Sequence, residues 1–130
     1  MKIAAITILI IAVLIGGALV LAGNKGSNNN VQPTANNVSV IDGQQIIEIK
    51  AKGGYLPRKS VAQAGLPTTL RFNTNGTFDC SSSVRIPSLN ISKLLPPSGT
   101  IDIDLGSPQA ATLQGMCGMG MYLFEIDFRN

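Results

Sequence analysis

Apolar and polar side chains alternate along several short runs after residue 45. A period of two is typical of β-strands that bury one face. The apolar positions that we expect to face a core are Ile47, Ile49, Ala51, Leu70, Phe72, Val84, Ile86, Ile101, Ile103, Leu105, Tyr122, Phe124, Ile126 and Phe128. In the last run, Glu125 and Asp127 then point outward. Turn residues separate the runs, so the pattern predicts an all-β sandwich of two sheets, with no helix longer than about two turns.

The beginning of the chain has a different pattern, because residues 3–22 carry no charged side chain. Twenty helical residues span about 30 Å, which is the thickness of the hydrocarbon core of a bilayer. This length predicts an N-terminal transmembrane helix that anchors the protein at residues 1–22. A cleaved signal sequence is the alternative, although its apolar region is usually only about 7–15 residues long. We expect the rest of the chain to be extracytoplasmic, either tethered to the cell membrane by this single pass or secreted after cleavage.

Residues 23–44 are rich in asparagine, glycine and serine and show no hydrophobic period. Such a composition is typical of a flexible polar linker. Residues 45–130 are therefore predicted to form the folded domain. A domain of this length buries one core and is too small for a large multidomain enzyme.

The composition excludes several kinds of functional site, because the chain has no histidine and only two cysteines. A Ser-His-Asp triad, an HExxH zinc site and a histidine-ligated haem all require histidine. Two cysteines cannot form a four-thiolate zinc or iron–sulfur site within one chain. The net charge of +3 is not gathered into a basic patch, so we expect no binding to nucleic acid. No nucleophile is accompanied by a base, and we expect that the protein is not an enzyme.

Soft sulfur ligands are concentrated in residues 114–121, just before the last predicted strand. Cys117, Met119 and Met121 alternate there with glycines, and Met116 precedes them. Glycine weakens a strand, so we expect a loop here that wraps closely around something. Thiolate and thioether ligands together favour Cu(I). The alternative is that these methionines and the cysteine only fill space in a core, which is the role we expect for Met116.

The sequence Cys-Gly-Met-Gly-Met-Tyr at residues 117–122 resembles the ligand loop of cupredoxin-like domains, in particular a histidine-poor bacterial branch associated with copper handling. The resemblance continues upstream in Gly-Tyr-Leu-Pro at residues 54–57, Asp-Cys-Ser at residues 79–81 and Val-Arg-Ile-Pro at residues 84–87. It implies a Greek-key β-sandwich with copper at one end. By this resemblance Cys80, Cys117 and Met121 are metal ligands, and Met119 lies on the same loop.

The absence of histidine separates this chain from the blue-copper members of the family, which use two histidines and one cysteine. The resemblance therefore implies a membrane-tethered Cu(I)-binding protein, such as a copper chaperone, buffer or resistance factor. Its expected partners are the copper ion, the membrane and a protein that donates or accepts copper. The main alternative is a tethered interaction domain without metal, in which Cys80 and Cys117 form a structural disulfide.

Overall fold

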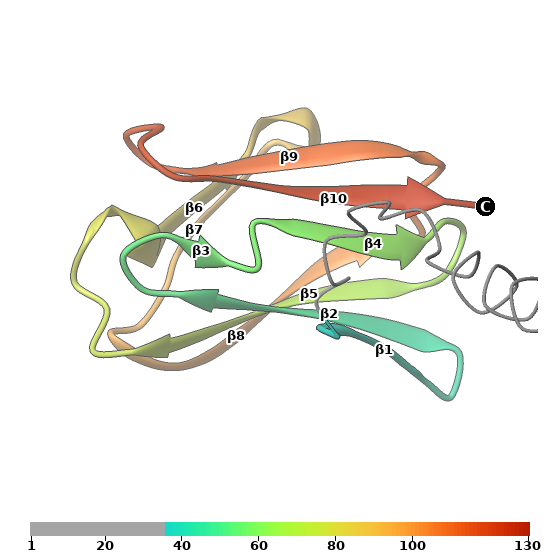
Figure 1. Ribbon diagram of the computed structural model, residues 1–130, viewed down its shortest axis with the longest axis horizontal. Helices are drawn as coiled ribbons and strands as arrows, with labels where there is room; N and C mark the ends of the chain where they lie inside the picture. The colour runs from blue at the N-terminus through green and yellow to red at the C-terminus, as the bar shows by residue number, and fades with distance from the viewer. Residues whose placement is uncertain (1–35) are drawn as a thin grey trace, which may run out of the picture. The chain divides into compact units, whose positions relative to one another are not determined.

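Two five-stranded β-sheets face each other in the computed structural model, which describes residues 36–130 (Figure 1). The first sheet has the order β1-β2-β5-β8, and β3 pairs with β2. Its strands are β1 (Val38–Ile41), β2 (Gln44–Ala51), β3 (Tyr55–Leu56), β5 (Thr68–Asn75) and β8 (Ser98–Gly106). The second sheet has the order β4-β10-β9-β6-β7. Its strands are β4 (Lys59–Gln63), β6 (Ser83–Ile86), β7 (Ile91–Leu94), β9 (Ala111–Cys117) and β10 (Leu123–Arg129).

The strands that lie side by side are mostly not consecutive in the chain. β2 pairs in parallel with β5, and β4 pairs in parallel with β10. The remaining pairs are antiparallel, including the β9–β10 hairpin. The chain therefore crosses repeatedly between the sheets, and its connections gather at the two ends of the sandwich, as is usual for this architecture.

The predicted register of the strands is confirmed. In β10, Phe124, Ile126 and Phe128 are all at most 3% exposed, and Tyr122 just before the strand packs against the same core. The alternating inward positions of β2, β5, β6 and β8 likewise join one cluster. A strand shifted by one residue would turn all of these side chains to the outside, so burial of this one set establishes the register.

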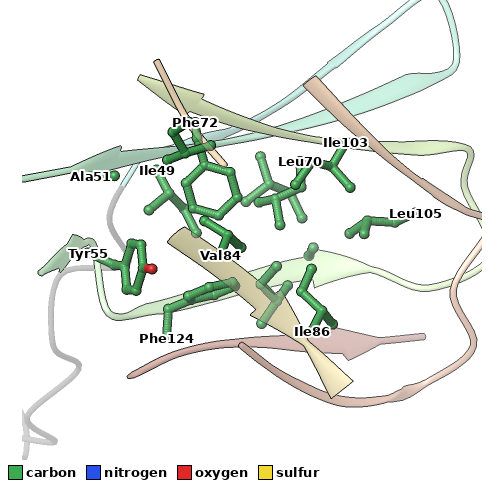
Figure 2. Packing of buried hydrophobic residues seen from close by; sticks show 14 of the residues in the cluster. Ile49, Ala51, Tyr55, Leu70, Phe72, Val84, Ile86, Ile103, Leu105 and Phe124 are labelled. Carbon is green, nitrogen blue, oxygen red and sulfur yellow. The ribbon is translucent and has the colours of Figure 1, made fainter. Parts of the chain in front are cut away.

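Three aromatic rings of the core pack against one another near one end of the sandwich (Figure 2). Tyr55 from β3, Phe72 from β5 and Phe124 from β10 meet edge to face, with ring centroids 5.0–5.9 Å apart. The arrangement is the one that the charge distribution of aromatic rings favours. Because the rings come from both sheets, they fix the spacing of the sheets beside the connections at that end.

The helical content agrees with the prediction that no helix exceeds two turns. The helices among residues 36–130 are two 3-10 helices of three residues each, η1 (Cys80–Ser82) and η2 (Pro87–Leu89). No helix in that range is long and apolar enough to cross a membrane. The anchor or signal predicted at residues 1–22 lies outside the described residues and stays a prediction.

The predicted boundary between linker and domain is wrong in one respect. Strand β1 lies at Val38–Ile41, inside the range 23–44 that we expected to be linker, and it pairs with β2. It escaped the hydrophobic pattern because it has only four residues and none of them is fully buried: Val40 and Ile41 are more than half exposed. The folded part of the chain therefore begins before residue 45.

Candidate metal centre

The two cysteines come together at one end of the sandwich. Cys80 begins η1 in the connection from β5 to β6, and Cys117 ends β9. The connection from β5 to β6 and the connection from β9 to β10, which follows Cys117, both lie at the left in Figure 1. The Cα atoms are 5.6 Å apart and the two sulfurs form a disulfide, which leaves no free cysteine among residues 36–130. The structure thus joins the two residues that we expected to be copper ligands, in the pairing of the alternative interpretation.

Asp79 holds the helical turn that carries Cys80. Its carboxylate accepts hydrogen bonds from the hydroxyl of Ser81 at 2.9 Å and from the backbone N–H of Ser81 at 3.4 Å, which caps η1. Partial burial opposes ionisation of this carboxyl, but hydrogen bonds from Ser81 and from the backbone of Gly53 outweigh it and hold the pKa of Asp79 below its usual range.

The end of η1 is held by two further hydrogen bonds. The hydroxyl of Tyr55 donates to the backbone oxygen of Ser83 at 2.9 Å. The backbone N–H of Leu95 donates to the oxygen of Ser82 at 2.7 Å. Burial of Tyr55, helped by the charge of Asp79, raises the pKa of its phenol, so the hydroxyl stays protonated and keeps donating. These bonds position Cys80 from both sheets without using the disulfide.

Cys117 lies in a different environment from Cys80. It is 0% exposed and packs in the hydrophobic core, whereas Cys80 is only partly buried at the edge of that core. Its Cα lies opposite that of Val84 in β6. The backbone N–H of Tyr122 points at its sulfur, with a nitrogen–sulfur distance of 3.5 Å. The buried sulfur of Cys117 therefore faces a backbone donor as well as Cys80.

The connection from β9 to β10 folds back over Cys117. The N–H of Cys117 donates to the oxygen of Tyr122 at 3.0 Å, and the N–H of Gly120 donates to the oxygen of Cys117 at 2.9 Å. A β-carbon on Gly118 would lie 2.8 Å from the hydroxyl oxygen of Ser83, so the loop closely approaches the end of η1. Gly120 has a φ of +73°, where glycine is favoured.

The prediction that residues 114–121 form a loop is only partly right. β9 continues to Cys117, and residues 118–122 alone make the connection. The glycine that argued against a strand, Gly115, lies opposite Phe124 in the hairpin, and the Phe124 ring occupies the place of its missing side chain. Glycine at this strand position therefore reflects a close approach by the aromatic core rather than a turn.

The two predicted thioether ligands lie on this connection, outside the core. Met119 is 80% exposed and Met121 is 64% exposed. Met121 also lines a surface cavity of about 410 Å³, together with the glycines before β3 and the side chain of Tyr122. Met116 differs, because it is partly buried, pairs with Arg85 and precedes Cys117 in the strand, which turns it to the opposite face.

Four sulfur-bearing side chains lie on the connections at this end of the sandwich, at Cys80, Cys117, Met119 and Met121. No cluster of three or more histidine, cysteine, aspartate or glutamate side chains that could hold a metal occurs within residues 36–130. A metal bound here would depend on the sulfurs of Cys80, Cys117, Met119 and Met121. When the two cysteines are reduced, this donor set suits a soft ion such as Cu(I) and does not suit Mg²⁺ or Ca²⁺.

The supporting residues around the cysteines were not found from the sequence. The cap of η1 has a local signal, because an aspartate two residues before a serine is typical of a capped turn. The hydrogen bond from Tyr55 to Ser83 has no local signal in the sequence, because the two residues are 28 positions apart and belong to different sheets.

A family model described as a cupredoxin-like domain matches residues 10–125. No curated protein sequence matches the chain at a significant level. The solved structures that resemble it include the Cu(I)-bound metal-binding domain of the Cu(I)-exporting P-type ATPase CopA from Streptococcus pneumoniae D39. That domain is 21% identical, with a TM-score of 0.65 over 72% of this chain and 93% of that one.

Two other solved structures have a similar fold. A copper binding protein in its apo form is 22% identical, with a TM-score of 0.65 over 71% of this chain and 94% of that one. Auracyanin A, a "blue" copper protein from Chloroflexus aurantiacus, is 18% identical, with a TM-score of 0.54 over 67% of this chain and all of the other. At these identities the likeness concerns the fold.

Proposed function

Because the chain belongs to the cupredoxin-like domain family, we propose that it is a copper-binding protein that holds Cu(I) through Cys80, Cys117, Met119 and Met121. We further propose that it acts as a copper chaperone, buffer or resistance factor and performs no catalysis. Two of the proteins with a similar fold are a metal-binding domain with bound Cu(I) and a copper binding protein, which supports copper as the cargo. In this proposal residues 1–22 tether the domain outside the cytoplasm.

The observation that carries the proposal is the position of the two cysteines beside the methionine loop. Cys80 and Cys117 come from separate connections and meet with Cα atoms 5.6 Å apart. Met119 and Met121 follow Cys117 by two and four residues, and their exposure leaves both thioethers free to turn toward a bound ion. A structural disulfide accounts for both cysteines, but it does not account for two thioethers on the short connection that follows Cys117.

The choice of Cu(I) over Cu(II) follows from the chemistry of the donors. Thiolates and thioethers are soft ligands, and Cu(I) is the soft state of copper. Cu(II) in blue-copper sites is held largely by imidazole, which this chain lacks. The domain is therefore expected to store or transfer Cu(I) and to be a poor electron carrier.

A second function is favoured by the disulfide itself. If the bond between Cys80 and Cys117 is permanent, it closes a loop with a sequence separation of 37 and stabilises a tethered interaction domain that binds no metal. Such a role accounts for both cysteines but assigns nothing to Met119 and Met121. The two functions differ in whether the reduced protein binds copper.

Competition with the Cu(I) chelator bathocuproine disulfonate tests the proposal on the reduced full-length protein. We expect the wild type to withhold one equivalent of Cu(I) from the chelator. The double variant Cys80→Ser, Cys117→Ser should lose this binding by more than the about 10–100-fold that removal of a second-shell partner costs, because a hydroxyl is a hard ligand. Unchanged affinity in the double variant would exclude the copper site.

Methionine variants supply the matched control for this experiment. Met121→Leu and Met119→Leu keep an apolar side chain of similar volume, so each should leave the fold intact and lower Cu(I) affinity to a smaller extent. Met116→Leu makes the same chemical change on the other face of β9 and should leave affinity unchanged. If Met116→Leu and Met121→Leu lowered Cu(I) affinity equally, the lower affinity would come from a change in the fold and not from a lost ligand.

A further inference from the structure

The disulfide and the proposed copper site use the same two sulfur atoms. A sulfur bonded to another sulfur is not a thiolate, and the thiolate is the form of cysteine that ligates metal. Cys80 and Cys117 are both in the disulfide, so in this state the protein keeps only the thioethers of Met119 and Met121 as soft donors. The oxidised state and the copper-loaded state therefore exclude each other.

From this exclusion we propose that the Cys80–Cys117 disulfide is a redox gate, which a thiol opens by attack on Cys80 and which closes the site to Cu(I) when it re-forms. The inference rests on the proposed function, since a gate needs a site to control. It adds the condition under which that site exists and the order in which its bond is broken.

The order of attack follows from the unequal burial of the two cysteines. Cys80 lies at the partly exposed start of η1, whereas Cys117 is 0% exposed within β9. Access decides which sulfur of a disulfide is attacked. An external thiol therefore reaches Cys80, and Cys117 is the leaving group. The backbone N–H of Tyr122, 3.5 Å from the sulfur of Cys117, faces the negative charge that develops there.

The reaction balances with two molecules of a small thiol, RSH. The first thiolate forms a bond to the sulfur of Cys80, the Cys80–Cys117 bond breaks, and Cys117 leaves with the electron pair. The second thiolate attacks the mixed disulfide and releases Cys80, so the products are the reduced protein and RSSR. Two electrons pass from the thiols to the protein, and their two protons end on the cysteine sulfurs. The gate closes by the reverse exchange, in which RSSR is the oxidant and is reduced to two RSH as the Cys80–Cys117 bond re-forms.

The scaffold keeps the two cysteines close after the bond is broken. Val84 at the start of β6 pairs with Cys117, and the bonds from Tyr55 to Ser83 and from Leu95 to Ser82 hold the end of η1 against both sheets. None of these contacts involves sulfur. Reduction therefore leaves two neighbouring thiols rather than two separated loops, and this is what a reversible gate requires.

Two samples of the full-length protein test the gate, one oxidised and one reduced and freed of reductant. Each competes with bathocuproine disulfonate for Cu(I) without oxygen, with ascorbate instead of a thiol so that the disulfide survives. We expect the reduced protein to bind Cu(I) at least about 100-fold more tightly than the oxidised protein. The reason is that loss of direct ligands lowers metal affinity by more than loss of second-shell partners does.

Each result of the competition has a definite meaning. Equal retention by both samples would overturn the gate and leave the proposed function standing. Retention by neither would overturn the proposed function, and the gate with it. Two free thiols that never pair in air, measured with Ellman's reagent, would overturn the gate whatever the copper result.

The order of attack is tested with the two single variants. Cys117→Ser leaves Cys80 as the free thiol, and Cys80→Ser leaves Cys117. The rate of reaction with Ellman's reagent, divided by the rate in urea, should be at least about tenfold higher for Cys80, because a buried thiol reacts only through local opening. The division removes differences in intrinsic reactivity, and far-UV circular dichroism with a cooperative urea transition shows that each variant is folded. Mass spectrometry of the oxidised wild type after a limiting amount of glutathione should find the adduct on Cys80. An equal or higher ratio for Cys117, or an adduct on Cys117, would overturn this order.

Discussion

Gly115 shows how one residue connects the core to the candidate site. It lies opposite Phe124 in the β9–β10 hairpin, two residues before Cys117. A β-carbon at this position would lie only 2.0 Å from the Phe124 ring. The ring cannot move aside easily, because Tyr55 and Phe72 pack edge to face against it. A residue without a side chain is therefore needed here for the core to close beside the cysteines.

We expect Gly115→Ala to lower the free energy of unfolding by about 1–3 kcal/mol, the usual cost of overpacking a core. Urea unfolding measures the change. Phe124→Leu on its own should also destabilise the protein, but in the double variant the smaller side chain leaves room for the methyl group, so the two losses should not add. Additive losses would mean that the ring and the glycine do not share this space.

The short helix η1 is the element on which the position of Cys80 depends. A helix of three residues has no stability of its own, and Asp79 stabilises it by accepting hydrogen bonds from the backbone and side chain of Ser81. One side chain thus fixes the connection between the sheets next to the disulfide.

We expect Asp79→Ala to reduce stability at pH 7 by about 1 kcal/mol, as for loss of a helix cap. Hydrogen bonding lowers the pKa of Asp79 in the folded state, so its contribution is present above the unfolded value of about 3.9 and is lost as the pH falls through the folded value. The gap between wild type and variant in urea unfolding should therefore shrink below about pH 4. A gap that stays constant between pH 7 and pH 2 would show that the charge is not involved.

At the scale of the whole molecule, the disulfide links two connections that are far apart in sequence. The bond spans a sequence separation of 37, and it joins the region after the first sheet's β5 to the end of β9 in the second. A crosslink of this kind restricts the unfolded chain more than the folded one. The folded state around it is held by a core drawn from both sheets, which the crosslink does not supply.

Reduction of the disulfide should lower the free energy of unfolding by about 4 kcal/mol, from the loop-closure entropy for this separation. The protein is expected to stay folded, because single domains typically have about 5–15 kcal/mol of stability. Urea unfolding with and without dithiothreitol measures the difference, and the double variant Cys80→Ser, Cys117→Ser should not respond to the reductant. Identical midpoints for oxidised and reduced wild type would contradict this estimate.

The register of the strands could be predicted from the sequence because side-chain alternation is a local property of a half-buried strand. It succeeded in β10, where three inward side chains are nearly inaccessible. It failed for β1, because a strand of four residues with no fully buried side chain is too short to show a clear alternation. It also misjudged Gly115, because the ring that fills its place comes from another strand.

Some features of the candidate site likewise follow from the sequence, and others depend on the tertiary structure. The sequence by itself determined which chemistry is available: no imidazole, two thiols and a short run of thioethers, a set that selects a soft metal. Whether Cys80 meets Cys117 depends on how β5, β6 and β9 are arranged in two sheets, and the tertiary structure decided it by joining them. It also decided that Cys117 is buried and Cys80 only partly buried, because burial is a property of what the rest of the chain packs against each residue.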